Sequence, residues 1–199
     1  MRGPPIGYIE PPPHIPLLLR FLLFFAERRL GKGLVANRIL AWYPRLFIGS
    51  GVMESLVAHD EPDVPRRLLG LIRLYTSFLV SCPFCIDMNA HGLGQGRVSD
   101  EEIKALQGTV PFEQVSSFDQ REKAALAFVK SMCSTPLAFP TQVVEQLRKH
   151  FAERAIVIIA GTCAQVNFWA RLIQGLGVSP AGFCERWPAL NLDAFATRK

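Results

Sequence analysis

The sequence has no stretch of alternating polar and apolar residues of the kind that a half-buried β-strand requires, and it has no internal repeat. It also has no long basic run and no base-stacking motif, so nucleic-acid binding has little support despite a formal net charge of +5. Only 20% of its 199 residues are charged, whereas 49% are hydrophobic. A chain of this length and composition buries a sizeable core. We therefore expect an all-α protein.

The N-terminal region contains no signal-peptide pattern, because proline-rich segments take the place of a basic lead-in. Residues 1–16 carry repeated prolines and are expected to form an extended arm, with one helical domain over residues 17–199. The apolar run at 17–25 contains Arg20 and is shorter than the ~20 residues that span a bilayer. It predicts a helix in the core or in a subunit interface, with binding to a membrane surface as the alternative and no transmembrane segment.

The cysteine count of five is odd, which argues against a framework of structural disulfides. It fits a reducing compartment, so we expect a cytoplasmic protein. Outside the motif described below, Cys133, Cys163 and Cys184 stand singly in apolar sequence and are expected to be core or interface residues.

Glycine and proline separate a series of segments with helical apolar spacing. The segment from Arg66 to Val80 has a clear apolar stripe, and Ser99 with Glu102 forms the pattern of a capping box. The expected helices are 17–29, 34–42, 44–58, 66–80, 83–95 with a stop at Gly96, one opening at Ser99, 118–132, 140–150 and 153–176, the last with a fully buried apolar part at 155–161.

The segment with the clearest chemistry is Cys82-Pro-Phe-Cys85, which predicts the first turn of a helix. Pro83 suits the first helical position and leaves Cys82 at the cap, where free N–H groups favour a thiolate. Two thiols three residues apart on such a turn can close a disulfide, with Phe84 and Ile86 as an apolar wall. The motif therefore predicts thiol redox chemistry, and two buried apolar residues without chemistry are the alternative.

Helical spacing limits which polar groups act with the thiols. Asn89 lies four residues after Cys85 and continues its face, whereas His91 points about 120° away from Cys85. His91 is expected to pair with Asp87 on the flank of the helix. Asp87, His91 and Tyr75 are thus expected to lie around the site without acting directly on the sulfur.

Structural zinc is the competing use of the motif, but it takes four ligands that usually come from two pairs of residues. This chain offers one pair, and His91, His59 or Cys163 would have to complete the site. We therefore expect neither a metal nor another cofactor.

Several motifs together resemble the carboxymuconolactone decarboxylase and alkylhydroperoxidase D-like (AhpD-like) family, in particular its peroxidase-related branch. The resemblance covers residues from about 17 to 180. It is carried by the apolar helix leading into C-x-x-C-x-D-x-N, a following Asp-Glu-Glu helix start, Asn167-Phe-Trp-Ala-Arg171, Leu176-Gly177-Val178, and Gly31-Lys32-Gly33 with Ile39-Leu-Ala-Trp-Tyr-Pro44.

The resemblance implies an all-helical fold that assembles into homo-oligomers through its helices. In redox members of the family the two cysteines reduce a hydroperoxide and are re-reduced by a dithiol protein or a small thiol. By the same resemblance, Cys85 attacks the peroxide and Cys82 resolves the product, although the position of Cys82 at the helix start favours a lower pKa for Cys82.

Two positions depart from the family pattern. Its best-studied peroxidatic sites have a Glu where this chain has Gly70 and a His where it has Asn89. Asn89 forms hydrogen bonds but cannot take a proton. Glu54, His59 and Tyr75 are the alternative bases in the preceding segment.

Two other functions remain open at this stage. One is a lyase that resembles the decarboxylase branch, although the sequence shows no convincing acid–base pair. The other is a redox-sensing oligomer that keeps the fold without efficient catalysis.

Overall fold

The computed structural model describes residues 7–31, 33–56, 61–94, 97–184 and 187–196. Within these ranges the chain forms helices and no strand, as the sequence predicts. The helices are α1 (Leu17–Leu30), α2 (Val35–Leu40), α3 (Pro44–Leu56), α4 (Arg66–Leu79), α5 (Pro83–Leu93), α6 (Asp100–Leu106), α7 (Gln120–Met132), α8 (Thr141–His150), α9 (Glu153–Gly175) and α10 (Leu192–Ala196), with short 3-10 helices η1 (Phe112–Gln114) and η2 (Pro188–Leu190).

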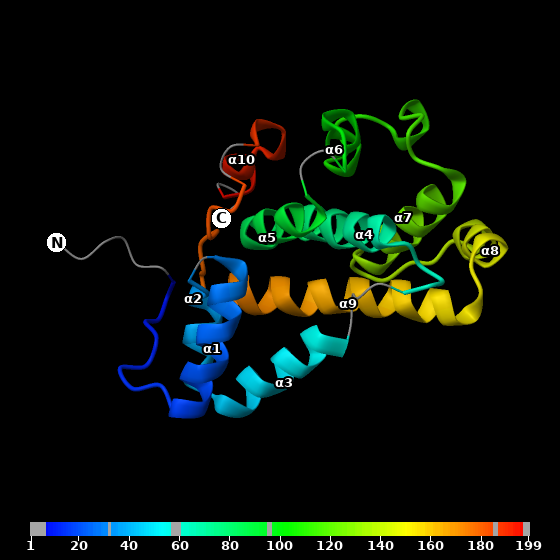
Figure 1. The fold of residues 1–199 in the computed structure, drawn as a ribbon. Coiled ribbons are helices and arrows are strands. Elements are labelled where there is room, and N and C mark those ends of the chain that lie inside the picture. The colour runs from blue at the N-terminus through cyan, green and yellow to red at the C-terminus, as the bar shows by residue number, and fades with distance from the viewer. Residues whose placement is uncertain (1–6, 32, 57–60, 95–96, 185–186, 197–199) are drawn as a thin grey trace.

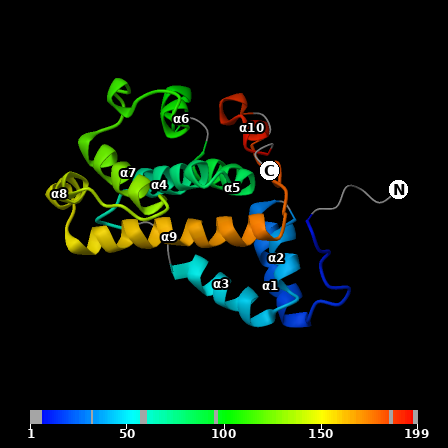
Figure 2. The same ribbon diagram turned by 180° about the vertical axis from the view of Figure 1, so that it is seen from behind.

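The long helix α9 runs through the middle of the molecule, with α4 and α5 along one side of it and α3 along the other (Figure 1). The view from behind shows α7 beside α4 and shows α8 at the N-terminal end of α9 (Figure 2). Helices α1 and α2 lie at the opposite end of α9 (Figure 1). The site described below lies near that end, where α5, α2 and the last turns of α9 meet.

The apolar stripe predicted on α4 is confirmed, because Leu68, Leu71, Ile72, Tyr75 and Phe78 are all buried. Their spacing of three and four residues places them on one side of the helix. They join residues of α5, α7 and α9 in the largest apolar cluster of the described structure. This packing holds α4, and therefore the start of α5, against α9.

The expectation that the segment 155–161 is fully buried is wrong. Ala155 and Ile159 are buried, but Val157 is 70% exposed. Val157 follows Ala155 by two residues, about 200° around the helix, so its side chain points away from the buried side of α9. Among the described helices, α9 is long and apolar enough to span a bilayer, and 39% of its most apolar window is buried inside the protein.

Several helix ends differ from those predicted. The capping box of Ser99 and Glu102 is confirmed. Helix α5 ends at Leu93, because Gly94 follows with φ 88°, a left-handed conformation that glycine adopts without strain. The predicted end at 95–96 lies outside the described residues. Helix α7 starts at Gln120 after its own capping box, while η1, η2 and α10 are not predicted from the sequence.

The described part of the N-terminal arm, residues 7–16, is non-helical, as its prolines predict. The Tyr8 backbone N–H donates to Leu176 O at 2.9 Å, and the Trp42 indole N–H donates to Glu10 O at 2.9 Å. These contacts tie the arm to the C-terminal end of α9 and to the segment after α2.

Helix α1 is only partly buried within the single chain. Leu19 and Leu23 pack on α9, in a cluster with Leu172 and Leu176. The other large apolar side chains of the run 17–25 are exposed: Leu17, Leu18, Phe21, Leu22, Phe24 and Phe25. Burial of the whole run in the core of one chain is therefore excluded, and burial in a subunit interface and binding to a membrane surface both stay predictions.

Candidate active site

The connection between α4 and α5 places the two motif cysteines. The chain leaves α4 through Ser81, which has φ 49°, and the Cys82 backbone N–H then donates to Ser77 O at 3.1 Å. Cys82 is the N-cap of α5 and Pro83 is its first residue, as predicted. The tight turn fixes the start of α5 against the end of α4.

The thiols of Cys82 and Cys85 are joined as a disulfide, with 5.3 Å between their Cα atoms. The Cys85 backbone N–H donates to the Cys82 Sγ at 3.2 Å. This N–H is one of those at a helix start that have no partner within the helix, and it stabilises negative charge on the sulfur that accepts it. The geometry therefore favours a thiolate at Cys82 when the pair is reduced.

Both cysteines are buried, Cys82 at 0% and Cys85 at 3% exposure. They lie in an apolar cluster with Ala36 and Ile39 of α2, Ala170 and Ile173 of α9, and Val178, against which Phe84 and Trp169 also pack. Phe84 is part of the predicted apolar wall. Ile86 is not, because it faces the other side of α5 and belongs to the main core.

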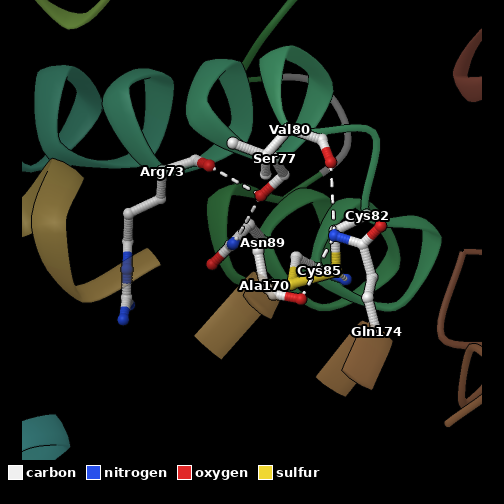
Figure 3. The surroundings of a disulfide bond; sticks show 8 residues. All are labelled: Arg73, Ser77, Val80, Cys82, Cys85, Asn89, Ala170 and Gln174. Carbon is white, nitrogen blue, oxygen red and sulfur yellow. Dashed lines mark hydrogen bonds between the residues drawn. A yellow bond between two sulfur atoms is a disulfide. The ribbon is translucent and has the colours of Figure 1, made fainter. Parts of the chain in front are cut away.

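Asn89 lies one turn beyond Cys85, and its amide points to Ser77 (Figure 3). The Asn89 Nδ2 donates to Ser77 Oγ at 2.9 Å, and Ser77 Oγ donates to Arg73 O at 2.8 Å. The amide of Asn89 therefore links α5 to α4 beside the thiols. Sequence reasoning did not identify Ser77, because no motif marks it and only the packing of α4 on α5 brings it to Asn89.

Gln174 is a second polar residue that the sequence did not indicate. Its side-chain Nε2 donates to Val80 O at 3.2 Å and to Ala170 O at 3.1 Å, close to the disulfide (Figure 3). It thus ties the last turns of α9 to the segment that leads into the motif.

The predicted pairing of Asp87 with His91 is wrong. The Asp87 carboxylate is fully buried and accepts backbone N–H groups of Phe183 at 3.0 Å and Cys184 at 2.7 Å. The His91 ring stacks on Phe183, with 4.8 Å between ring centroids. Both side chains therefore hold the C-terminal segment against α5, on a side of the helix away from the disulfide.

Tyr75 and Glu54, two of the three alternative bases, are engaged in contacts with other side chains. Tyr75 packs edge-on against Phe112 in the main core, and burial together with negative charge at Cys133 raises the pKa of Tyr75 to about 12. The Glu54 carboxylate accepts hydrogen bonds from Arg73, Gln165 and Trp169. His59 lies outside the described residues.

Gly70 lies at a close approach of α4 and α5. A Cβ on Gly70 would come within 2.5 Å of the Leu93 Cδ1, so Leu93 occupies the space of a side chain at this position. Gly70 is also seven residues, about 10 Å along α4, from Ser77, the partner of Asn89. No carboxylate therefore reaches the site from position 70.

No family model matches the sequence. Among curated proteins, the uncharacterized protein YdfG of Bacillus subtilis (strain 168) is 24% identical over 118 residues, which cover 59% of this chain and 78% of YdfG.

Solved structures match over more of the chain. The debrominase Bmp8 in its apo form superposes with a TM-score of 0.75 at 19% identity, covering 94% of this chain and 97% of Bmp8. An uncharacterized peroxidase-related protein from Silicibacter sp. TM1040 gives 0.74 at 17% identity, covering 90% and 94%. One from Ralstonia eutropha JMP134, described as an alkylhydroperoxidase AhpD core, gives 0.72 at 18% identity, covering 89% and 94%. The predicted AhpD-like helical fold is confirmed.

Proposed function

We propose that this chain of AhpD-like fold is a thiol-dependent oxidoreductase whose Cys82 and Cys85 reduce hydroperoxides. The observation that carries the proposal is the placement of both sulfurs on the first turn of α5, bonded to each other in an apolar surrounding. The AhpD-like and peroxidase-related neighbours support a peroxide-related role. Among the described residues no group of three or more metal-ligating side chains gathers, and the proposed chemistry uses no cofactor.

The reaction needs only the two thiols, a hydroperoxide and a reductant. The Cys85 thiolate attacks the terminal peroxide oxygen, the O–O bond breaks, and the alkoxide leaves as an alcohol after taking a proton. The Cys82 thiolate then attacks the sulfur of the Cys85 sulfenic acid, which forms the disulfide and displaces hydroxide, and the hydroxide takes a proton from solvent and leaves as water. The hydrogen bond from the Cys85 N–H to Cys82 Sγ suits this assignment, because it stabilises negative charge on the resolving sulfur.

Asn89 contributes to this reaction by position. Its amide is held by Ser77 and does not act as an acid or a base near neutral pH. The proton released when Cys85 ionises therefore passes to solvent or to the reductant, and we expect slower turnover than a site with a Glu and a His relay would support.

The burial of both cysteines bears on the reductant. A folded dithiol protein would have to bring its own thiol to the Cys82–Cys85 disulfide, in which neither cysteine is more than 3% exposed. A small dithiol meets a smaller steric barrier. We therefore favour a small thiol as the reductant, in the reducing environment of the cytoplasm.

The test is the consumption of cumene hydroperoxide with dithiothreitol as the reductant. We expect catalytic turnover that is lost when the reduced protein is first alkylated with iodoacetamide. Mass spectrometry of the protein after one equivalent of hydroperoxide should show the Cys82–Cys85 disulfide. If the two thiols remain free and no hydroperoxide is consumed, the proposal is wrong.

A halogenated aromatic compound is a second acceptor class for the same dithiol. This alternative is favoured by the superposition on the debrominase Bmp8, which covers 94% of this chain. A cysteine-to-alanine variant of Bmp8 has been solved in complex with 2,3,4-tribromopyrrole. Release of bromide from this bromopyrrole with dithiothreitol, without consumption of cumene hydroperoxide, would assign the second function in place of the first.

We also propose that the chain forms a homo-oligomer through the exposed apolar face of α1. Phe21 is 60% exposed and Phe25 53%, and their rings contact each other with 4.6 Å between centroids. Replacing both with glutamate should lower the mass measured by light scattering, because charge on the face opposes its burial in an interface. The control is Leu137→Glu, an exposed apolar residue between α7 and α8. An unchanged mass in the double variant would exclude α1 from the interface.

A further inference from the structure

We propose that Cys133 and Cys163 form a second oxidation site, which hydroperoxides convert into a disulfide between α7 and α9. The two cysteines are 30 residues apart in the sequence, and no motif connects them. In the structure their Sγ atoms lie 3.8 Å apart. Each stands alone in the sequence, and the expectation that they are core residues agrees with the burial of Cys163 and the partial burial of Cys133.

The two sulfurs need only a small movement to bond. A disulfide has an S–S distance of about 2.05 Å, so the Sγ atoms must approach by roughly 1.8 Å. Cys133 follows the last residue of α7 as its C-cap, where the chain turns into the loop before α8. Cys163 is fully buried within α9. Cys133, at the end of α7, therefore has more freedom to move than Cys163, which is held within α9.

The environment of Cys133 differs from that of an inert core cysteine. Cys133 is half-buried, and the residues from Thr135 to Pro140 that follow it are exposed, so a small oxidant reaches the pair from this side. The Asn167 amide Nδ2 lies 3.5 Å from Cys133 Sγ and 3.6 Å from Cys163 Sγ, and the Thr76 hydroxyl donates to Cys163 Sγ at 3.5 Å. Thr76 of α4 and Asn167 of α9 therefore both contact the sulfur pair.

The hydrogen bonds act in opposite directions on the two thiols. The Cys163 thiol and the Asn167 amide donate to Cys133, and Arg171 adds positive charge, so the pKa of Cys133 falls to about 7 despite its burial. The negative end of α7 opposes this effect. The same contact with Cys133, together with burial, raises the pKa of Cys163. Tyr75, which also faces Cys133, stays neutral because its pKa is about 12.

This asymmetry assigns the order of the chemistry. The Cys133 thiolate attacks a hydroperoxide, the O–O bond breaks, an alcohol leaves with one proton, and Cys133 becomes a sulfenic acid. The sulfenic acid is neutral, so the negative charge on Cys133 that raised the pKa of Cys163 is no longer present. Cys163 then attacks the Cys133 sulfur, and its proton leaves with the displaced hydroxide as water.

The second pair works independently of the first. Cys163 precedes Ala170, which packs beside Cys82 and Cys85, by seven residues or about 10 Å along α9. Direct exchange between the two pairs would need sulfurs in contact. Oxidation at Cys133 therefore does not depend on whether Cys82 and Cys85 turn over.

The first test uses the Cys82→Ser/Cys85→Ser variant, reduced and then treated with cumene hydroperoxide. Trypsin separates the remaining cysteines, because Cys133 lies in fragment 131–148, Cys163 in 155–171 and Cys184 in 172–186. We expect a linked pair of the first two fragments, while Cys184 stays alkylatable. Recovery of Cys133 and Cys163 as free thiols would overturn the proposal. If the variant does not fold, the same linked fragments can be sought in the parent chain. There Cys82 and Cys85 share fragment 74–97, so their disulfide does not link two fragments.

The second test follows the intermediate. In Cys163→Ser, which keeps a donor beside Cys133, dimedone should trap a sulfenic acid at Cys133 after hydroperoxide treatment. In the parent, alkylation of Cys133 by iodoacetamide should rise with pH around a midpoint near 7, because the thiolate is the reacting form.

Asn167→Ala should move that midpoint upward, and an increase of one unit from 7 lowers the reactive fraction at pH 7 about fivefold. Asn89→Ala is the matched control, because it removes an amide that bonds to Ser77 rather than to Cys133. A midpoint near the ordinary thiol value in the parent, with no trapped sulfenic acid in Cys163→Ser, would overturn the assignment.

Discussion

In a Cys133→Ser/Cys163→Ser background, replacing Cys85 with serine is expected to lower hydroperoxide turnover by roughly a thousandfold or more, because the substitution removes the attacking sulfur and no second thiol pair remains. A hydroxyl at this position cannot form a sulfenic acid, and it cannot bond to Cys82. The fold should not suffer, since serine is smaller than cysteine and the chain keeps the N-cap at Cys82. Steady-state consumption of cumene hydroperoxide with dithiothreitol measures the effect.

The matched variant is Cys82→Ser, which separates attack from resolution. The attacking Cys85 remains, so in the same Cys133→Ser/Cys163→Ser background one equivalent of hydroperoxide should still be consumed and dimedone should trap the sulfenic acid. Turnover then depends on direct reduction of that acid by dithiothreitol. Cys184→Ser, which lies away from both thiol pairs, should leave turnover unchanged. If Cys85→Ser keeps full turnover while Cys82→Ser loses it, the roles of the two cysteines are reversed.

Replacing Asp87 with asparagine is expected to destabilise the protein by about 2–4 kcal/mol. The carboxylate is completely buried, and its two oxygens accept backbone N–H groups from Phe183 and Cys184. An amide presents one oxygen and one NH₂ group, so one backbone N–H loses its acceptor and faces another donor. Leaving a buried donor unpaired costs the desolvation of that group without compensation.

The free energy of unfolding from urea denaturation measures this effect. Glu145→Gln is the control, because Glu145 is exposed on α8 and the same chemical change there should cost little. His91→Asn should fall between the two, since it removes the stacking contact with Phe183, which is worth about 1 kcal/mol. Equal stability of Asp87→Asn and the parent would contradict the structural role assigned to Asp87.

The helices were largely predictable from the sequence because their signals are local. The apolar stripe of α4 and the capping box at Ser99 each lie within one turn or one helix, and both are confirmed. Helix α5 was extended too far because the predicted stop passed over Gly94, two residues before Gly96. Helix α10 was missed because its five residues carry too little periodicity to be recognised.

In the candidate site, too, contacts within one helix were predictable from the sequence and contacts between distant segments were not. Helical spacing correctly placed Cys82 at the cap, kept Asn89 on the side of Cys85 and removed His91 from it. The same reasoning paired Asp87 with His91, because it considered only neighbours on one helix. A backbone segment almost a hundred residues later supplies the partners that Asp87 takes in the fold.

The sequence by itself determined that the chain is helical and that Cys82 and Cys85 share the first turn of a helix, since both depend on intervals of three or four residues. Only the tertiary structure decided what surrounds the pair: Ser77 at Asn89, α2 and α9 as apolar walls, and Leu93 in the space at Gly70. It also brought Cys133 to Cys163. Contacts of this kind depend on how separate helices pack, and no short interval in the sequence encodes that packing.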